Sequence, residues 1–575
     1  MFKEVFQLFN FLSNQLKKKV VLFFIFLAIS SLLELLSIGI IFPSLNYIIN
    51  SENQSFDFLF NLFLDDKLFT IKNKLLVFLS IYIIIVSSKI LFMIFFTWWR
   101  NNLVYYIENN LSVNLYRNYL NFNIDSFKSA NSSEFAKNII MEIKKARLSI
   151  DICLRSLIEI ISIIIISAVL VFYQPLATIT VLAFISIILF LFLFIFKKIL
   201  FEFGKKDVIF TGKVFKSLQG GLNSIKSVLI HGNQNYFVSS FAKFNEKRVN
   251  ALKTMATINE NIRNAIEFFA VLLLVFIILI LLKHDDNIQN LIPSLTLFGV
   301  ALYRLMPATN RLLNYLNGFE ASKASIQLLS KHFVRKEKYN RINSKEKLQF
   351  KKYIICKNIS YSYSKEEKVI NNLSFKINKN DFIAICGASG IGKSTLIDLI
   401  CGLIKPKKGK IILDSKTNIH QNINAWKKNI GYVPQSSYIL DSDIKENIVF
   451  GEKRFKKDKL TTAINFSNLK NFVNKKKEGV NFRVGESGCN LSGGQAQRIC
   501  IARAIYSSPE ILICDEITNS LDKKNEKKII DSLLKLRGKM TIICITHNLN
   551  AFKSKFIRKY EFINKKNKSE LTKKI

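Results

Sequence analysis

The stretch Phe382–Ile400, FIAICGASGIGKSTLIDLI, decides the fold of the C-terminal half of the chain. An apolar run of β type leads into a glycine-containing loop, and a helical segment with apolar periodicity follows. The loop fits the pattern Gly-x-x-x-x-Gly-Lys-Ser/Thr in the strand, loop and helix context that this pattern requires. The stretch therefore predicts an α/β domain of the P-loop NTPase type.

Glycines in such a loop let backbone N–H groups close around phosphates at the start of a helix. We predict that Lys393 reaches the β- and γ-phosphate oxygens and that Ser394 offers its hydroxyl to Mg²⁺. The predicted ATP contacts of this loop are Gly387, Ala388, Ser389, Gly390, Ile391, Gly392, Lys393, Ser394 and Thr395.

A second motif, PEILICDEITNSLD, lies at residues 509–522. Four apolar residues end in Asp515 and Glu516, as in a buried strand that ends in acids. Beside a phosphate loop, Asp515 is placed to hold a metal ion and Glu516 to polarise an attacking water. Taken alone this signal is weak, because strands often end in a surface acid.

The stretch NLSGGQAQRICIARAI, residues 490–505, resembles the ATP-binding cassette (ABC) family through its signature Leu491–Gln495. The resemblance covers the whole chain and implies an exporter half-transporter that hydrolyses ATP to drive transport. It implies that Tyr363 stacks on adenine, that Gln435 binds Mg²⁺ and that His547 contacts the γ-phosphate. Glu486 resembles the segment that touches the intracellular loops. The residues that the resemblance adds to the ATP site are Tyr363, Gln435, Ser492, Gly493, Gly494, Gln495, Asp515 and Asp522, with Glu516 and His547 as catalytic residues and Ser394, Gln435 and Asp515 as Mg²⁺ ligands.

One departure from the family pattern concerns the segment Thr518–Asp522. The family usually reads Thr-Ser-Ala-Leu-Asp there, whereas this chain has Thr-Asn-Ser-Leu-Asp. In the family each signature completes the ATP site of the opposite cassette, which implies a dimer. Because Glu516, His547 and the signature are all intact, we expect a homodimer rather than a heterodimer.

The N-terminal half is different, because long apolar runs occupy most of it. A chain of 575 residues is too long for one core, and each run is long enough to cross a hydrocarbon layer of about 30 Å. The six predicted spans lie near residues 20–42, 75–99, 157–173, 176–196, 266–282 and 291–312. We therefore predict a polytopic α-helical membrane domain of six helices at 1–335, a linker at 336–348 and the cassette at 349–575.

The long polar loops after the second and fourth spans are rich in Lys and Arg. By the positive-inside rule these loops and both ends of the chain are cytoplasmic, and the resemblance implies the bacterial inner membrane. The net charge of +41 alone would suggest a nucleic-acid partner. Lysines are, however, scattered through every polar segment, so we expect no nucleic acid. The 8 cysteines lack C-x-x-C spacing and are predicted to be reduced core residues.

Charged residues within or beside the spans bear on the cargo, because intramembrane charges are costly and usually face a pathway. The predicted cavity residues are Lys89, Arg263, Arg304 and Arg311. Snorkelling to the headgroups is the alternative for Lys89, Arg263 and Arg311. It is weaker for Arg304, which lies roughly 20 Å along a span that starts near Leu291. Arg304 and Arg311 share a helix face around Pro307, and guanidinium groups bind phosphate bidentately.

The segments ALYRLMPATNR (301–311) and LELLSIGIIFP (33–43) resemble the flippase of polyprenyl-diphosphate-linked oligosaccharides in bacterial protein N-glycosylation. The resemblance implies that the four basic residues contact the lipid diphosphate, with Lys89 in place of an arginine. It also implies that an amphipathic segment at 55–64 assists the lipid tail. Segments near 124–134 and 220–231 are candidate coupling helices. The alternatives are an exporter of other lipids, peptides or drugs, and a non-transporting ABC ATPase.

Overall fold

The computed structural model describes most of the chain. It covers residues 14–39, 71–124, 127, 132–173, 175–284, 288–334, 347–363, 368–452, 454–517, 523–547, 549, 552, 557–565 and 568–574. The chain divides into two compact units. The first comprises Met1–Phe122 and Ala130–Lys338, and the second comprises Asn123–Ser129 and Tyr339–Ile575.

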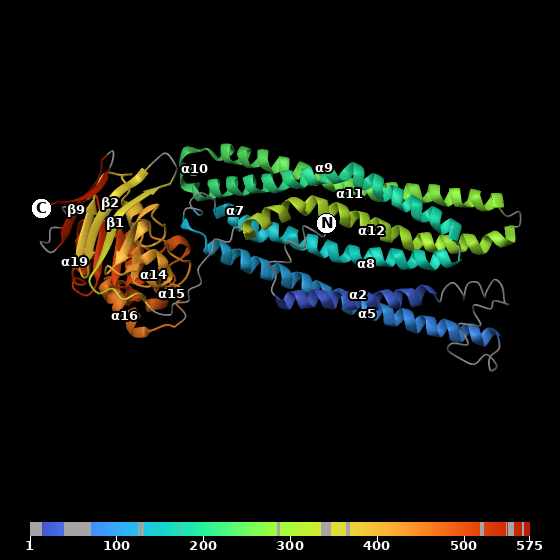
Figure 1. Ribbon diagram of the computed structural model, residues 1–575, viewed down its shortest axis with the longest axis horizontal. Coiled ribbons are helices and arrows are strands. Elements are labelled where there is room, and N and C mark those ends of the chain that lie inside the picture. Colours follow the sequence, from blue (N-terminus) through green and yellow to red (C-terminus); the bar gives the residue numbers. More distant parts are fainter. Residues whose placement is uncertain are drawn as a thin grey trace. The chain divides into compact units, whose positions relative to one another are not determined.

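The first unit is helical, as expected for apolar segments that must satisfy their backbone groups within a bilayer. Its described helices are α2 (Asn14–Gly39), α5 (Ile71–Leu120), α7 (Ser132–Lys137), the π-helix η2 (Asn138–Glu142), α8 (Ile143–Tyr173), α9 (Pro175–Asn223), α10 (Ile225–His231), α11 (Gln234–His284) and α12 (Ile288–Val334). Helix α9 packs along α11, α8 along α12, and α2 along α5 (Figure 1).

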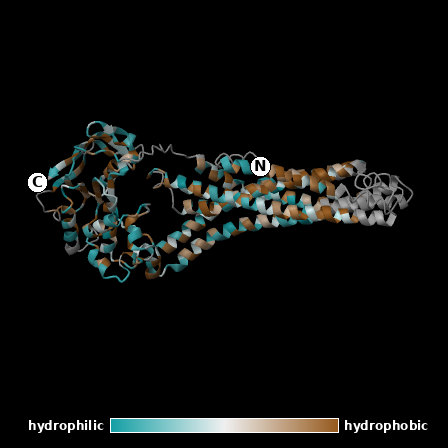
Figure 2. Cartoon of the chain, turned by 90° about the horizontal axis from the view of Figure 1, so that it is seen from below, coloured by the Kyte–Doolittle hydropathy of each residue, from teal (hydrophilic) through white to brown (hydrophobic). Residues whose placement is uncertain are grey.

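Each predicted span falls on a different long helix, and the helices continue well beyond the apolar runs. The run at 176–196, for example, belongs to α9, which extends to Asn223. Hydrophobic residues accordingly gather along one part of the bundle and hydrophilic residues along the rest (Figure 2). Within the described residues, three segments are long and apolar enough to cross a membrane: Asn14–Ser37, Leu79–Leu120 and Ser133–Val169. The predicted helical membrane domain is confirmed.

Glycine lets α9 and α12 approach closely. A methyl group added at Gly204 of α9 would overlap the backbone carbonyl oxygen of Ala321 in α12. Small residues at a helix crossing permit this kind of backbone contact. The contact between Gly204 and Ala321 therefore sets the distance between α9 and α12 at this level.

An ionic cluster is buried in the same unit. The carboxylate of Glu142, at the end of η2, is 0% exposed and lies 3.4 Å from Lys137 Nζ and 3.8 Å from Lys145 Nζ. Lys145 Nζ also donates to Asp207 of α9 at 2.5 Å. Because buried charges are costly unless paired, these contacts tie α7, η2, α8 and α9 together.

The second unit contains two sheets, one with the order β2-β1-β4-β5 and one with the order β10-β9-β3-β8-β7-β6. The strands are β1 (Tyr353–Ser362), β2 (Lys368–Asn378), β3 (Phe382–Cys386), β4 (Lys408–Leu413), β5 (Thr417–Asn418), β6 (Ile430–Val433), β7 (Ile511–Asp515), β8 (Thr541–Ile545), β9 (Arg558–Lys565) and β10 (Lys568–Lys574). The α-helices are α13 (Lys393–Ile400), α14 (Ile423–Lys427), α15 (Ile444–Val449), α16 (Lys457–Phe466), α17 (Lys470–Asn474), α18 (Gly493–Tyr506) and α19 (Lys523–Leu534).

Strands β3, β8, β7 and β6 run parallel. Every residue of β3, β7 and β8 is buried, which explains why these strands read as continuous apolar runs. Successive residues enter two different cores: Ile511 and Ile513 belong to one, Leu512 and Cys514 to the other. The sheet is thus covered on both faces, and the predicted α/β domain is confirmed.

All eight cysteines are free. Seven of them are buried, whereas Cys489 is exposed, so its assignment to the core is wrong. Cys489 follows a short 3-10 turn, Glu486–Gly488, which leads out to the start of α18.

Candidate functional site

One edge of the large sheet collects most of the residues predicted to handle ATP. The phosphate loop follows β3, Asp515 ends β7, and Glu516 comes next. His547 lies two residues beyond β8, and Gln435 two residues beyond β6. Because the four strands are parallel, their carboxyl ends meet at one edge, where ligands of open α/β sheets bind.

Two glycines of the phosphate loop are required by its shape. Gly387 has a φ of +155°, and a Cβ there would lie 2.8 Å from the carbonyl oxygen of Phe562. Gly392 has a φ of +110°, and a Cβ there would lie 3.0 Å from a methyl carbon of Val369. Other residues would be strained at either position. The tight loop brings backbone N–H groups to the start of α13, where anions bind.

The ammonium group of Lys393 is held over this loop. Its Nζ donates to the carbonyl oxygens of Gly387 at 2.8 Å and Ala388 at 2.9 Å, and the residue is 5% exposed. At the other end of the loop, Tyr363 Oη lies 3.2 Å from Thr395 Oγ1, while its ring is 49% exposed. The predicted phosphate contact and the predicted adenine platform are thus linked through one turn of α13.

Both carboxylate oxygens of Glu516 have a hydrogen-bond partner. His547 Nε2 lies 2.8 Å from its Oε1, and Gln435 Nε2 donates to its Oε2 at 2.6 Å. The backbone of Glu516 has a φ of +49°, an angle that is uncommon for residues other than glycine and asparagine. Its backbone N–H donates to Ile545 O of the neighbouring strand at 3.1 Å. The structure therefore brings Gln435, Glu516 and His547 together, as the motifs predict.

Asp515 directly precedes Glu516, and its two carboxylate oxygens differ in their hydrogen bonding. Its Oδ2 is 3.4 Å from the hydroxyl of Tyr432, but its Oδ1 is buried and accepts no hydrogen bond within the described residues. Burial, and then the neighbouring Glu516, raise the pKa of the Asp515 carboxyl. An unsatisfied buried carboxylate oxygen suits Mg²⁺, which prefers hard oxygen ligands, and Ser394 and Gln435 at the same sheet edge carry further oxygen donors. The residues present thus fit the predicted metal ion.

Sequence reasoning missed Tyr432. Burial is the main cause that raises the pKa of its phenol, and Asp515 raises it further, so the hydroxyl stays protonated and donates to Asp515. Tyr432 belongs to β6 and is the first residue of the YVPQ motif that contains Gln435. The signal available in the sequence was its position at the end of a parallel strand, beside the acid that ends the next strand.

The signature residues form a separate group at the start of α18. The Ser492 hydroxyl accepts from Gln495 N at 3.3 Å, while Gln495 Oε1 accepts from Ser492 N at 2.9 Å. This reciprocal capping box fixes the first turn and leaves Ser492 and Gly493 exposed. The signature thus presents a helix N-terminus to solvent. Asp522 and the rest of Thr518–Asp522 lie outside the described residues.

The basic residues predicted to line a cargo cavity lie on three helices, and each described side chain has a carboxylate partner. Lys89 of α5 lies 3.7 Å from Glu34 of α2. Arg263 of α11 lies 3.0 Å from Glu267, one turn along the same helix.

Arg311 of α12 donates from Nε and Nη2 to both oxygens of Glu159, on α8, at 2.7 and 3.0 Å. Arg304 belongs to α12, which continues through Pro307, but its side chain lies outside the described residues. The structure therefore does not gather the described basic residues into one unpaired cluster.

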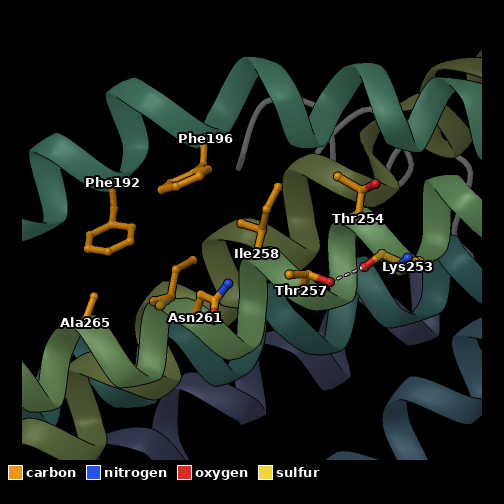
Figure 3. A pocket seen from close by; sticks show the side chains of 9 residues that line it. Phe192, Phe196, Lys253, Thr254, Thr257, Ile258, Asn261 and Ala265 are labelled. Carbon is orange, nitrogen blue, oxygen red and sulfur yellow. Dashed lines mark hydrogen bonds between the residues drawn. The ribbon is translucent and has the colours of Figure 1, made fainter.

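Sequence reasoning also missed a pocket between α9 and α11, with a volume of about 390 Å³ (Figure 3). Phe192 and Phe196, stacked at 5.5 Å, form its apolar side, and residues of α11 form the rest. Its lining comprises Phe192, Phe196, Lys253, Thr254, Thr257, Ile258, Asn261, Ile262 and Ala265. The α11 members recur at helical spacing on one face, a signal that a search for charged residues overlooks.

Two family models match the chain. The ABC transporter transmembrane region matches residues 13–305, and the ABC transporter cassette matches residues 370–519. Among relatives, a protein of Rickettsia conorii named as an export ATP-binding/permease protein is 27% identical over 79% of both chains. A multidrug resistance-like ATP-binding protein of Buchnera aphidicola is 31% identical over 58% of both chains.

The fold is similar to that of a bacterial Atm1-family ABC exporter solved with ATP bound. The TM-score is 0.79 over 95% of this chain and 94% of that chain, at 18% identity. Combined with the two matching models, this covers both the helical unit and the cassette. The chain therefore belongs to the ABC transporter family, as an exporter half-transporter whose cassette binds and hydrolyses ATP to drive transport.

Proposed function

We propose that this ABC exporter is a homodimeric flippase that moves a polyprenyl-diphosphate-linked oligosaccharide, or a related glycolipid, across the bacterial inner membrane. The observation that carries the proposal is the guanidinium of Arg311. Its side chain remains 51% exposed although it binds Glu159 with two N–H groups. A fork of two N–H donors is the arrangement that recognises a phosphate group.

The carboxylate partners add a condition to this proposal. Glu159 occupies the Nε and Nη2 pair among the five N–H donors of Arg311, so a diphosphate that binds this pair competes with Glu159. The Arg263–Glu267 pair is a weaker competitor, because both side chains are more than half exposed and exposed pairs contribute about 0–1 kcal/mol. Cargo binding is therefore accompanied by loss of the Arg311–Glu159 contact.

We propose that the sheet-edge residues supply the energy for this movement. Backbone N–H groups of the phosphate loop and Lys393 bind the ATP phosphates. Mg²⁺, when held by Ser394, Gln435 and Asp515, neutralises phosphate charge. Glu516, positioned by Gln435 and His547, accepts a proton from the attacking water. The exposed signature turn at Ser492 and Gly493 completes the site of the second copy.

A second candidate is export of a hydrophobic or drug-like amphiphile. The pocket of Figure 3 favours it, because phenylalanine rings and aliphatic side chains supply most of its lining and Lys253 is its one basic member. The named multidrug resistance-like relative points in the same direction. The two candidates differ in whether Arg304 and Arg311, or Phe192 and Phe196, govern transport.

The experiment compares variants of the full chain in proteoliposomes. Flipping of a labelled lipid-linked oligosaccharide is expected to fall about tenfold or more in Arg304→Ala/Arg311→Ala, because each charge-assisted phosphate contact contributes about 1.5–3 kcal/mol. Basal ATPase activity should remain. The control is Arg248→Ala, which removes an arginine of α11 whose side chain donates two hydrogen bonds to Asn245 on the same helix. Normal flipping in the double variant, or loss only in Phe192→Ala/Phe196→Ala, would reject the diphosphate cargo in favour of the amphiphile.

A further inference from the structure

A second pocket in the helical unit lies between α9 and α12 and has a volume of about 560 Å³. Its lining comprises Phe190, Leu193, Phe194, Lys197, Lys198, Phe201, Glu320, Lys323 and Gln327. The volume is within the range of ligand pockets, about 300–1,000 Å³. None of these residues belongs to the predicted cargo cavity or to the pocket of Figure 3.

The two ends of this pocket differ in chemistry. Phe190 and Phe194 stand one turn apart on α9, stacked at 6.1 Å, and are 68% and 78% exposed. Lys197 and Lys198 follow on the same helix face, at the point where the apolar run 176–196 ends. Such a transition from aromatic to basic residues is typical of the boundary between the hydrocarbon layer and the headgroups.

The basic end has an excess of positive charge. Lys197 Nζ lies 4.0 Å from Glu320 Oε1, and Lys323 Nζ lies 3.7 Å from Glu320 Oε2. The lining contains three lysines, Lys197, Lys198 and Lys323, and one carboxylate, that of Glu320, so it has a net charge of +2. The Lys197 side chain is still 59% exposed, whereas that of Glu320 is 11% exposed. A group that enters beside Lys197 and Lys198 therefore meets positive charge that Glu320 only partly offsets.

The pocket is also held in place by its surroundings. Directly beyond it on α9, Gly204 meets the Ala321 carbonyl of α12, one residue from Glu320. This backbone contact leaves no room for the two helices to close further at that level. Lys323 Nζ lies 5.9 Å from the centre of the Phe201 ring, a cation–π contact that directs the ammonium group toward α9. Lys323 of α12 is thus directed to the same pocket as Lys197 and Lys198 of α9.

We propose that this α9–α12 pocket binds an anionic phospholipid, with its phosphate between the lysines and an acyl chain along Phe190 and Phe194. The proposal is independent of the cargo. Charge complementarity selects an anionic headgroup, because basic residues beside a membrane attract anionic lipids. The exposed rings select a lipid over free phosphate, which has no apolar part to cover them.

The test measures lipid retention by the full chain, in nanodiscs and by native mass spectrometry. Wild type is expected to retain phosphatidylglycerol in preference to phosphatidylcholine. Lys197→Gln/Lys198→Gln/Lys323→Gln should weaken phosphatidylglycerol binding roughly tenfold to a hundredfold and leave phosphatidylcholine binding unchanged. The control is Lys205→Gln/Lys216→Gln/Lys243→Gln, which removes the same charge from exposed lysines farther along the helices.

Two further arms separate the lipid from other occupants. Phe190→Ala/Phe194→Ala should weaken binding of the long-chain lipid, and millimolar inorganic phosphate should fail to displace it from wild type. Displacement by phosphate, or equal loss of lipid in both lysine triples, would overturn the proposal. Conversion of a dimer to a monomer by the pocket triple, in detergent without added phospholipid, would show that a second copy covers the pocket and would also overturn it.

Discussion

The cassette and the helical unit differ in whether their charged side chains have partners of opposite charge. At the edge of the cassette sheet, Asp515 Oδ1 is buried with no hydrogen-bond partner among the described residues. In the helical unit, Glu142 lies between two lysines and Arg311 binds both oxygens of Glu159. The first arrangement gains from an added cation, whereas the second is already close to neutral. A cation can therefore bind Asp515 directly, whereas an anionic group that binds Arg311 must first displace Glu159.

The largest effect is expected at Glu516. Glu516→Gln removes the carboxylate that Gln435 and His547 position, and loss of a general base lowers rates by about 10²- to 10⁴-fold. Phosphate release by the full chain in liposomes measures the effect, and ATP binding should persist. The control Glu510→Gln alters an acid near β7 that pairs with Lys379 at 3.6 Å and should retain activity. Wild-type turnover in Glu516→Gln would remove the catalytic assignment.

The next effect concerns the helical unit, and its readout is stability. Glu142→Gln removes the carboxylate that lies between Lys137 and Lys145 in a site that is 0% exposed, and among the described residues only Lys145 keeps a second acid, Asp207. Breaking a buried ion pair from one side costs about 3–5 kcal/mol, so thermal unfolding of the purified full chain should begin at clearly lower temperature. Glu134→Gln, an exposed acid on α7, should leave unfolding unchanged. Equal unfolding of both variants would mean that the cluster is not a stabilising element.

The sequence predicts most of the fold because its strongest signals are local. Each apolar run falls on its own long helix, and a phosphate loop between a buried strand and a helix leaves little choice of topology. The pairing of the cavity charges could not be predicted in the same way. Glu159 is separated from Arg311 by 152 residues and Glu34 from Lys89 by 55, since 89 − 34 = 55. Only the packing of α8 on α12 and of α2 on α5 brings these partners together.

In the ATP site the same distinction holds. Motifs predict Lys393, Asp515, Glu516 and His547, because each follows a strand whose apolar run is visible in the sequence. Tyr432 has no motif of its own, and its role emerges only when β6 pairs with β7. The left-handed backbone of Glu516 is likewise a property of the strand end, which composition does not reveal.

A smaller effect is expected at Asp515, and it depends on pH. Burial and Glu516 raise the pKa of this carboxyl in the folded protein, so the folded protein binds the proton more tightly than the unfolded chain does. The resulting stabilisation is fully present below the pKa of the unfolded chain and is lost as pH rises through the pKa of the folded protein. At neutral pH without Mg²⁺, Asp515→Asn should therefore stabilise the protein, because the neutral amide avoids the buried negative charge that desolvation and Glu516 disfavour. The gain should vanish toward acidic pH. Thermal unfolding in EDTA measures it.

With Mg²⁺ and a non-hydrolysable ATP analogue present, the effect of Asp515→Asn on stability is expected to reverse, so that the wild type becomes the more stable protein. The ligand should stabilise wild type, because the cation meets Asp515 Oδ1, and should stabilise Asp515→Asn much less. If the variant and wild type gained equally from Mg²⁺ and the analogue, Asp515 would not be a metal ligand. The control is Ser507→Ala at the end of α18. We expect this variant to change neither the stability in EDTA nor the stabilisation by Mg²⁺ and the analogue.

In the proposed function, ATP hydrolysis at the sheet edge drives movement of a diphosphate-linked lipid through the helical unit. The most direct test follows a labelled lipid-linked oligosaccharide in proteoliposomes that contain the wild-type chain or Glu516→Gln. We predict that the lipid crosses the bilayer with wild type and ATP, and crosses neither without ATP nor with Glu516→Gln. Normal ATP hydrolysis by wild type without movement of the lipid, or movement that does not need ATP, would contradict this account.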